Sequence, residues 1–357
     1  MGLILEKIEY INNLLLEQLP EIKNTGLLKG KMGISLYFYH LSRATRSEDH
    51  RQQADAILDE VYEQVSSGGA TMDFQNGLAG IAWAIEHLVQ QQFVEADTDQ
   101  ILKDVDNKIY KRLASSSKIP LGILNGRLGY MLYIFSRLQG RDQPIDSSYN
   151  YILKKLLIDQ VNHVGQMVEE RKIDILPTTA FDITWDLPAC LAVLGRARAL
   201  DFYNTKIDMI LKQLSPVLLS LYPHALSNRL YLLFGMERVL NEVEIPGWRS
   251  HANFLKTDLQ PDYILESEMN DKHLILSNGV AGIALINRRL FRLTGDKSLR
   301  FDQEALIQKI TTSEYWELLE KIDLETVNIG MLNGLTGIGL QLVECLKTQK
   351  KSAETVI

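Results

Sequence analysis

A short motif recurs along this chain and constrains its fold more than any other feature. The motif is a Gly-x-x-Gly turn, usually preceded by Asn and followed by an apolar stretch, and its clearest form is LSNGVAGIAL at residues 276–285. Clear copies begin at Gly30, Gly77, Gly126, Gly279 and Gly334. A period of roughly 20–50 residues is typical of proteins that stack one supersecondary unit many times.

Two weaker copies complete the series. They lie around Pro188 and Arg229, where each of these residues stands in for the first glycine. With them the marks cover nearly the whole chain at intervals of about 50 residues. Stacked units bury their apolar faces only against their neighbours and form one continuous body. The repeat therefore predicts a single domain over residues 1–357, although the length alone would allow two or three.

Two kinds of helix alternate between the marks. Residues 50–66 carry a single apolar stripe that includes Ile57 and Val61, whereas residues 34–41 are apolar on nearly every side. A helix that is apolar all round is buried all round, and a striped helix lies at the surface. We therefore predict an all-α protein with apolar inner helices and striped outer ones. Helices are expected at these ranges: 3–19, 97–114, 189–200, 229–241, 281–293 and 335–347. Irregular connections are expected at 165–184 and 241–272, long enough to carry substrate or partner contacts.

Composition narrows the function classes. The net charge is −7 and Lys and Arg form no run, so no nucleic-acid partner is expected. Cys190 and Cys345 lie far apart and form no disulfide framework. No apolar stretch is long enough for a membrane span, and no basic segment precedes the first apolar residues as in a secretory signal. These features predict a soluble cytoplasmic protein.

The residues at each mark allow two interpretations. Asn precedes the mark in five copies: Asn76, Asn125, Asn228, Asn278 and Asn333. Asn is a preferred N-cap residue, so these side chains are expected to cap the inner helices. The first glycine is expected to relieve a turn that needs positive φ, and the second to let another backbone come close. If the inner helices run parallel, their N-termini also form a polar mouth that favours anionic or carbonyl ligands.

From about Gly26 to Leu346 the chain resembles the lanthionine synthetase C-like proteins, because the "LxNGxxGIAL"-like openings recur in register. The resemblance implies an α/α toroid of seven helical hairpins, with an inner and an outer ring of helices. In family members that act as cyclases, a Cys thiol of a precursor peptide adds to a dehydroalanine or dehydrobutyrine. A zinc ion held by two Cys and one His generates the thiolate, and a metal-bound thiol is deprotonated outright.

The chain departs from that family at the zinc ligands. Where the sixth repeat of the family has Cys-His-Gly, this chain has Ser277-Asn278-Gly279, and Ser227 stands where the fifth repeat has the other Cys. In the fourth repeat, Leu187 stands where the family often has His, with Asp186 beside it. Zinc sites use thiolate, imidazole or carboxylate ligands, so Ser and Asn are poor replacements. Cys190 and Cys345 lie in apolar stretches typical of buried thiols. No cofactor is expected. Zinc would be expected only if the assignment of these positions to the family's zinc ligands is wrong.

The resulting functional prediction is a pseudo-cyclase of a lanthipeptide-type modification pathway. It would bind a precursor peptide or a partner modification enzyme at the polar mouth. The residues expected to line the mouth or its rim are Asn76, Asn125, Trp185, Asp186, His224, Ser227, Asn228, Ser277, Asn278 and Asn333.

Two enzymatic alternatives remain open. One is an active thioether cyclase with unusual zinc ligands such as Asp186 and His224, the latter also a possible general base. The other is a carbohydrate-active toroid enzyme that uses Asp73 and Asp186 as acid and base, with the carboxyl groups roughly 5–10 Å apart. Both Asp residues precede inner helices, where a carboxylate often only caps the helix and offsets its dipole.

Overall fold

The structure is a computed structural model that describes residues 1–115, 118–139, 148–177, 180–269, 271–323 and 326–355. Within these ranges every regular element is a helix. Contacts divide the chain into two compact units. The single domain indicated by the repeat stays a prediction. None of the described helices is both long and apolar enough to span a bilayer.

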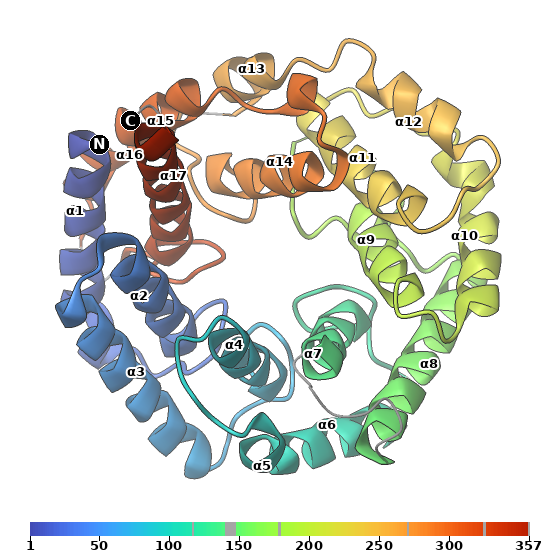
Figure 1. Ribbon diagram of the computed structural model, residues 1–357, viewed down its shortest axis with the longest axis horizontal. Helices are drawn as coiled ribbons and strands as arrows, with labels where there is room; N and C mark the ends of the chain where they lie inside the picture. The colour runs from blue at the N-terminus through green and yellow to red at the C-terminus, as the bar shows by residue number, and fades with distance from the viewer. Residues whose placement is uncertain (116–117, 140–147, 178–179, 270, 324–325, 356–357) are drawn as a thin grey trace. The chain divides into compact units, whose positions relative to one another are not determined.

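Unit 1 comprises residues 1–70, 260–285 and 300–357. In Figure 1, α2 and α17 lie side by side with α1 and α3 on their outer side. The elements are α1 (Gly2–Gln18), η1 (Leu19–Glu21), α2 (Lys31–Thr45), α3 (Glu48–Ser66), α13 (Pro261–Tyr263), η2 (Ile264–Glu268), the first part of α14 (Val280–Thr294), α15 (Gln303–Thr311), α16 (Tyr315–Leu319) and α17 (Leu335–Thr355).

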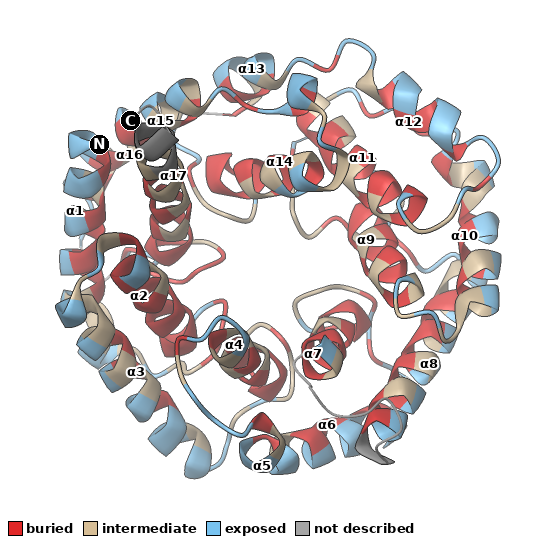
Figure 2. Cartoon of the chain, viewed as in Figure 1, coloured by how far each residue is buried: buried red, intermediate tan, exposed pale blue. Residues whose placement is uncertain are grey.

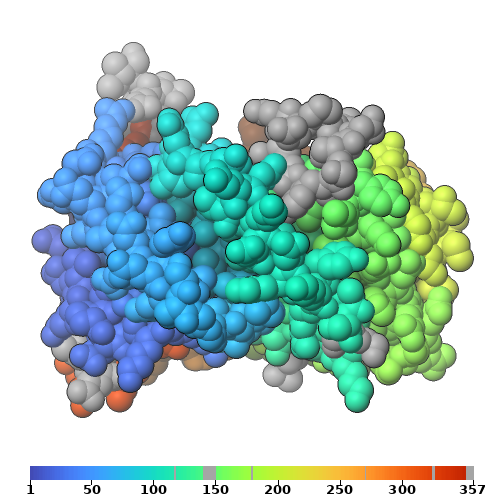
Figure 3. Space-filling model, turned by 90° about the horizontal axis from the view of Figure 1, so that it is seen from below, coloured from blue at the N-terminus to red at the C-terminus, as the bar shows by residue number. Residues whose placement is uncertain are grey.

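Unit 2 comprises residues 71–259 and 286–299. Its helices α4, α7, α9 and α11 follow the repeat marks, and the side chains of α5, α6 and α8 make up most of its face in Figure 3. The elements are α4 (Leu78–Gln90), α5 (Thr98–Ile101), α6 (Lys103–Ser115), α7 (Arg127–Gln139), α8 (Ser148–Glu169), α9 (Asp186–Arg198), α10 (Asn204–Leu218), α11 (Leu226–Leu240), α12 (Trp248–Lys256), the last part of α14 and η3 (Lys297–Leu299).

The two kinds of helix differ in burial as predicted (Figure 2). In α2 the consecutive side chains Tyr37, Phe38 and Tyr39 are all fully buried. In α3 burial is confined to one stripe formed by Ala54, Ile57 and Val61. A side chain buried on every face of a helix needs neighbours on every face, so α2 must pack between other elements. The helix expected at 97–114 is divided at Leu102 into α5 and α6.

The intact repeats share a closed loop before the inner helix. In five copies the residue after the first glycine donates its N–H to the carbonyl seven residues earlier: Lys31 to Asn24 (2.9 Å), Leu78 to Thr71 (2.9 Å), Arg127 to Pro120 (2.8 Å), Val280 to His273 (2.9 Å) and Leu335 to Asn328 (3.0 Å). A Cβ on Gly77 would lie 2.4 Å from the Thr71 oxygen, closer than any side chain tolerates. The loop therefore requires glycine for space.

Two expectations about the marks are wrong. The φ angles of Gly30 and Gly77 are −133° and −112°, so no positive φ is involved. These glycines are themselves the N-cap residues, and no side chain caps the helix there. Asn76 stands one residue before the cap, because the closed loop places the tight approach at the glycine and leaves Asn76 in the loop.

Neighbouring loops are joined by backbone hydrogen bonds. In unit 2 the N–H of Gln75 donates to the carbonyl of Leu124 at 2.9 Å. In unit 1 Ser277 donates to Leu332 at 2.9 Å, and Leu332 donates to Leu28 at 3.0 Å. Each of these residues lies two positions before its first glycine. The backbone at the same position of each loop therefore joins neighbouring repeats within each unit, which fixes the register of the loops.

The connections that were expected to be irregular contain more helix than predicted. Helix α8 extends to Glu169, and the range 241–272 contains α12 and α13, so its description as irregular is wrong. In α12 the buried residues Trp248, Ala252 and Leu255 recur at helical spacing. The Trp248 indole donates to the Ser215 hydroxyl at 2.8 Å, which fastens α12 to α10. Burial of this short stripe stabilises a helix of only nine residues.

Candidate functional site

The predicted residues of unit 1 lie in the loops before α14 and α17. Ser277 is half-buried and Asn278 is exposed, and the Ser277 hydroxyl donates to the Asn278 side-chain oxygen at 3.3 Å. The backbone bond from Ser277 to Leu332 brings this loop beside Asn333. The structure thus brings together three of the predicted side chains, and they are polar and uncharged.

The loop before α4 holds Asp73 and Asn76. One Asp73 oxygen accepts the Thr71 hydroxyl at 2.6 Å, and the other accepts the Asn76 N–H at 2.7 Å. Both carboxylate oxygens therefore stabilise their own loop. The bond from Gln75 to Leu124 places this loop beside the loop that contains Asn125, whose side chain is exposed.

Trp185 and Asp186 stand at the start of α9. The Trp185 ring is buried, and its indole donates to the carbonyl of Ile175 at 3.2 Å. Asp186 is the first residue of the helix. Just before them, Asp182 accepts the N–H and the hydroxyl of Thr184 at 2.8 and 2.7 Å. The hydrogen bond from Trp185 to Ile175 holds the connection that follows α8 against the N-terminus of α9.

The Asp186 carboxyl group has a perturbed proton affinity. Its pKa is raised to about 6, chiefly by burial and then by the nearby Asp174 carboxylate, while the Asp174 backbone N–H opposes the shift by donating to it. A Cβ placed on Gly122, in the loop before α7, would lie 3.9 Å from the Asp186 Oδ1. A carboxyl group with this pKa can take up or release a proton near neutral pH.

Ser227 and Asn228 are placed differently from their counterparts in unit 1. Helix α11 begins at Leu226, so both residues lie within its first turn, and only 1% and 2% of their surfaces are exposed. The expectation that the helix starts at Arg229 is wrong. The Arg229 N–H donates to Ala225 in an ordinary helical bond, because Arg229 has a Cβ and cannot occupy the glycine position of the closed loop. His224 is exposed in the turn before the helix.

The two cysteines are buried free thiols, as predicted. Burial raises the pKa of the Cys190 thiol to about 12, with Asp186 adding to the shift. Gln341 donates its amide to the Cys345 sulfur at 3.6 Å. A buried thiol with a raised pKa is a poor metal ligand and a poor nucleophile.

The three residues predicted to replace the family's zinc ligands offer a poor donor set for zinc. Ser227, Ser277 and Asn278 supply only hydroxyl and amide groups, and Ser227 is enclosed in the first turn of a helix. Throughout the described ranges, no three His, Cys, Asp or Glu side chains gather closely enough to hold a metal ion.

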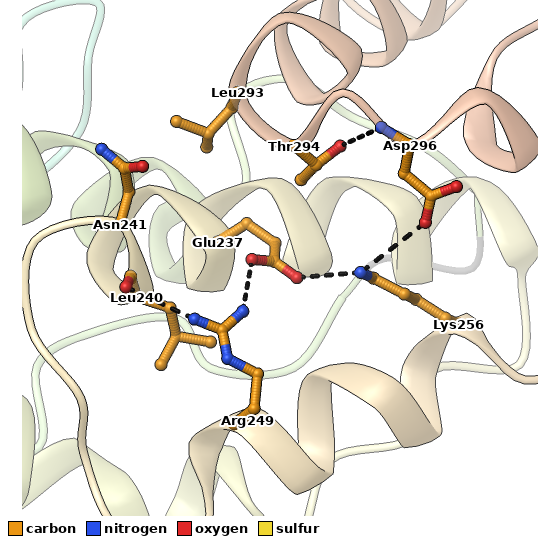
Figure 4. Close-up of a pocket in the computed structure, with 8 residues that line it drawn as sticks. All are labelled: Glu237, Leu240, Asn241, Arg249, Lys256, Leu293, Thr294 and Asp296. Carbon is orange, nitrogen blue, oxygen red and sulfur yellow. Dashed lines mark hydrogen bonds and ion pairs between the residues drawn. The ribbon is translucent and has the colours of Figure 1, made fainter.

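A pocket of about 400 Å³ at the C-terminal ends of α11 and α14 was missed by sequence reasoning (Figure 4). Glu237, which is nearly buried, accepts Arg249 at 2.9 Å and pairs with Lys256 at 3.1 Å, and Lys256 also approaches Asp296 at 3.8 Å. The remaining lining residues are Leu240, Asn241, Leu293 and Thr294. These ion pairs hold α12 against α11, so they stabilise unit 2. The apolar stripe of α12 is the sequence signal from which this pocket could have been predicted.

The sequence and the fold were compared with known proteins. Residues 21–174 match the family model described as "Lanthionine synthetase C-like protein". None of the curated proteins compared has a matching sequence. Among solved structures, the fold is similar to that of "Nisin cyclase", with a TM-score of 0.65 and 15% sequence identity over 96% of this chain and 93% of that chain.

The structural match and the family-model match support different conclusions. At 15% identity the structural likeness shows the fold, which is the predicted all-α, α/α-toroid class. The family model rests on the sequence of the first repeats, where the glycine marks are intact. Together they confirm that this chain resembles the lanthionine synthetase C-like proteins.

Proposed function

We propose that this chain serves a lanthipeptide-type modification pathway as a pseudo-cyclase, which binds a precursor peptide or a partner modification enzyme without zinc-dependent ring closure. The replacement of three zinc-ligand positions by Ser227, Ser277 and Asn278 carries the proposal. Thioether formation in the family depends on a metal-bound thiolate, and hydroxyl and amide side chains do not replace thiolate and imidazole ligands.

The polar loops before the inner helices support a peptide-binding role. Asn278 and Asn125 are exposed there, and Ser277 and Asn333 are partly exposed. Amide and hydroxyl groups donate and accept hydrogen bonds in the same way as a peptide backbone does. Such loops, fixed by glycine and by backbone bonds to the next repeat, present these groups in a constant register.

The metal half of the proposal is tested by elemental analysis of tag-free protein purified without chelator. The wild-type chain is expected to contain no zinc, even after incubation with it. Near one zinc per wild-type chain would overturn the proposal and restore the active-cyclase alternative.

The peptide half is tested with the dehydrated nisin precursor as the probe and nisin cyclase as the positive control. The expected result is saturable binding with no loss of free thiols, since no thioether forms. Loss of thiols at a rate comparable to the control would identify an active cyclase. Absence of saturable binding would overturn the peptide-binding role.

The carbohydrate alternative finds less support, because both Asp73 oxygens are engaged by the loop that contains it. Asp186, with its pKa near 6, is the group that an enzymatic alternative would use. Asp186→Ala distinguishes the cases, because only an enzyme that uses this carboxyl loses turnover by orders of magnitude.

A further inference from the structure

A series of side-chain hydrogen bonds joins three helices of unit 1. The Tyr37 hydroxyl donates to the Asn12 side-chain oxygen at 2.7 Å, and the Asn12 amide nitrogen lies 3.5 Å from the His50 Nε2. The His50 Nδ1 lies 3.1 Å from the Thr45 hydroxyl, which donates to the Leu41 carbonyl at 2.8 Å. This series, here named the His50 relay, leaves α2 at Tyr37, passes through α1 and α3, and returns to α2 at Thr45.

The two ends of the His50 relay fix the direction of its hydrogen bonds. Tyr37 is fully buried and gives its one hydroxyl proton to the Asn12 oxygen, so the Asn12 NH2 group faces His50. Thr45 gives its hydroxyl proton to Leu41, so it accepts a hydrogen bond from His50. We therefore assign His50 as the neutral tautomer, with its proton on Nδ1 and an acceptor lone pair on Nε2.

A second proton on His50 has no acceptor in this arrangement. Both nitrogens of an imidazolium are donors, so the Nε2–H would face the Asn12 NH2 group, which is also a donor. Turning the Asn12 amide over would present its oxygen to His50, but the Tyr37 hydroxyl proton would then lose its acceptor. A buried donor without an acceptor is costly, so protonation breaks one bond of the relay in either case.

The charged groups near His50 do not remove this conflict. Asp49 of α3 acts on the ring, while Arg51 of α3 pairs with Asp55 at 3.1 Å. From α17, Lys350 donates to a backbone carbonyl at the end of α2 at 2.6 Å. Helices α1 and α2 present the uncharged side chains of the relay. Burial lowers the pKa of His50 below its usual value, and the Asp49 carboxylate opposes this effect.

We propose that His50 is a pH-sensitive switch, which loosens α1 from α2 and α3 when it takes up a proton. Helix α1 packs mainly against α17 and α15, so the Asn12 side chain is a link from α1 to α2 and α3. The relay is complete above pH 6.5, the ordinary pKa of histidine, and its contribution to stability is lost as the pH falls below that value.

The first test measures the pKa of His50 by NMR titration of its ring protons, which His50→Gln assigns. Tyr37→Phe removes the hydroxyl that fixes the Asn12 amide, so the amide can turn its oxygen to a protonated His50. The pKa of His50 is expected to lie below 6.5 in the wild type and to be higher in Tyr37→Phe. Tyr39→Phe is the matched control, because Tyr39 is equally buried on α2 but donates to Asp55 outside the relay.

The second test measures the attachment of α1 by hydrogen exchange with mass spectrometry. Between about pH 7.5 and 5.5, the protection factors of α1 amides should fall about fivefold relative to those of α10, the effect of one lost buried hydrogen bond. In His50→Gln no such fall is expected, because the side chain does not titrate. His163→Gln should behave as the wild type, since His163 is a half-buried histidine of unit 2 with a lowered pKa.

Three outcomes would overturn the switch. One is the same pKa of His50 in the wild type and in Tyr37→Phe. Another is protection of α1 that does not change with pH, and the third is an equal fall in the wild type and in His50→Gln. If Tyr37→Phe does not fold, Asn12→Asp replaces it. A carboxylate accepts from both neighbours, so the pKa of His50 should rise in that variant, and an unchanged pKa would also overturn the switch.

Discussion

Two arginines of unit 2 occupy similar places on inner helices and have opposite surroundings. Arg137 of α7 is fully buried, and its neighbours are acidic: Glu86 of α4, Asp99 of α5 and Asp106 of α6. Arg196 of α9 is half-buried, and the charges that act on it are two further arginines. One residue type thus occupies two different electrostatic environments in one packed unit.

The ion pairs and hydrogen bonds around Arg137 stabilise the fold. Burial alone would lower the pKa of Arg137, but the Asp106 carboxylate, 2.9 Å from Nη2, and Glu86 raise it above its usual value. Thr98 accepts a further hydrogen bond at 3.1 Å, and the Tyr133 hydroxyl donates to Asp106. A buried charge is tolerated when its partners satisfy it with good geometry.

The difference separates a charge that its neighbours stabilise from one that they do not. In the Arg137 network each charge lowers the energy of its neighbours, and removing one leaves the others uncompensated. The charges that act on Arg196 have the same sign as its own, and one of them, Arg238, is itself paired with Glu242 at 3.1 Å. Substitution of Arg137 should therefore destabilise the protein, whereas substitution of Arg196 should leave its stability nearly unchanged.

The largest effect is expected for Arg137→Met. The change leaves Glu86 and Asp106 buried without their cation, so the free energy of unfolding should fall by about 3–5 kcal/mol. Urea denaturation at pH 7 measures it. Arg198→Met is the control, because Arg198 and Asp208 are partly exposed and such pairs contribute about 0–1 kcal/mol. Equal losses in both variants would contradict the assignment of Arg137 as a structural charge.

A smaller loss is expected for Tyr133→Phe, which removes one donor and preserves the packing of the ring. Asp106 retains its bond to Arg137, so the free energy of unfolding should fall by about 1–2 kcal/mol. The double variant with Arg137→Met should lose less than the sum of the single losses, since both side chains act on the same carboxylate. A strictly additive result would show that the network does not function as a unit.

Much of this fold could be predicted from the sequence because the determinants are local. Glycine in the first position leaves room for the closed loop, and the apolar residues after it form a helix that is buried on all sides. The same glycine, Gly279, predicts that Ser277 and Asn278 lie in a loop outside α14, as observed. Wherever the mark is intact, its position and the start of the helix agree.

The two weaker repeats, around Pro188 and Arg229, show where prediction from the glycine pattern ends. The closed loop leaves no room for a Cβ, so Arg229 cannot form it and α11 starts three residues earlier, at Leu226. Ser227 and Asn228 are thereby drawn into the helix and buried. The Arg137 network could not be predicted for another reason, since its members are far apart in sequence and only the packing of α4, α5, α6 and α7 brings them together.

Asp186 extends the comparison to an acid on which another acid, Asp174, acts. Its folded pKa, about 6, exceeds the ordinary 3.8, so the folded protein binds more protons than the unfolded chain between these values. Stability should therefore decrease as pH rises from about 4 to 6 and stay reduced above. Asp186→Asn should raise the free energy of unfolding at pH 7 by about 1 kcal/mol, after solvent screening is allowed for. Near pH 3, where Asp186 is protonated in both states, the substitution should leave the free energy of unfolding unchanged. Denaturation curves of both proteins across this pH range measure the difference; a constant difference at all pH values would exclude proton linkage.

The smallest effect on stability is expected for Arg196→Gln, and it sharpens the comparison most. The substitution loses the contact with the Phe135 ring, worth about 0.5–1 kcal/mol at a partly exposed site, and relieves repulsion from Arg238 and Arg289 of similar size. The two changes should nearly cancel at low salt, with a net change within about 0.5 kcal/mol. Because salt screens the repulsion, added salt should stabilise the wild type more than the variant. A loss as large as that of Arg137→Met would show that Arg196 is a structural charge, and the distinction between the two arginines would then be lost.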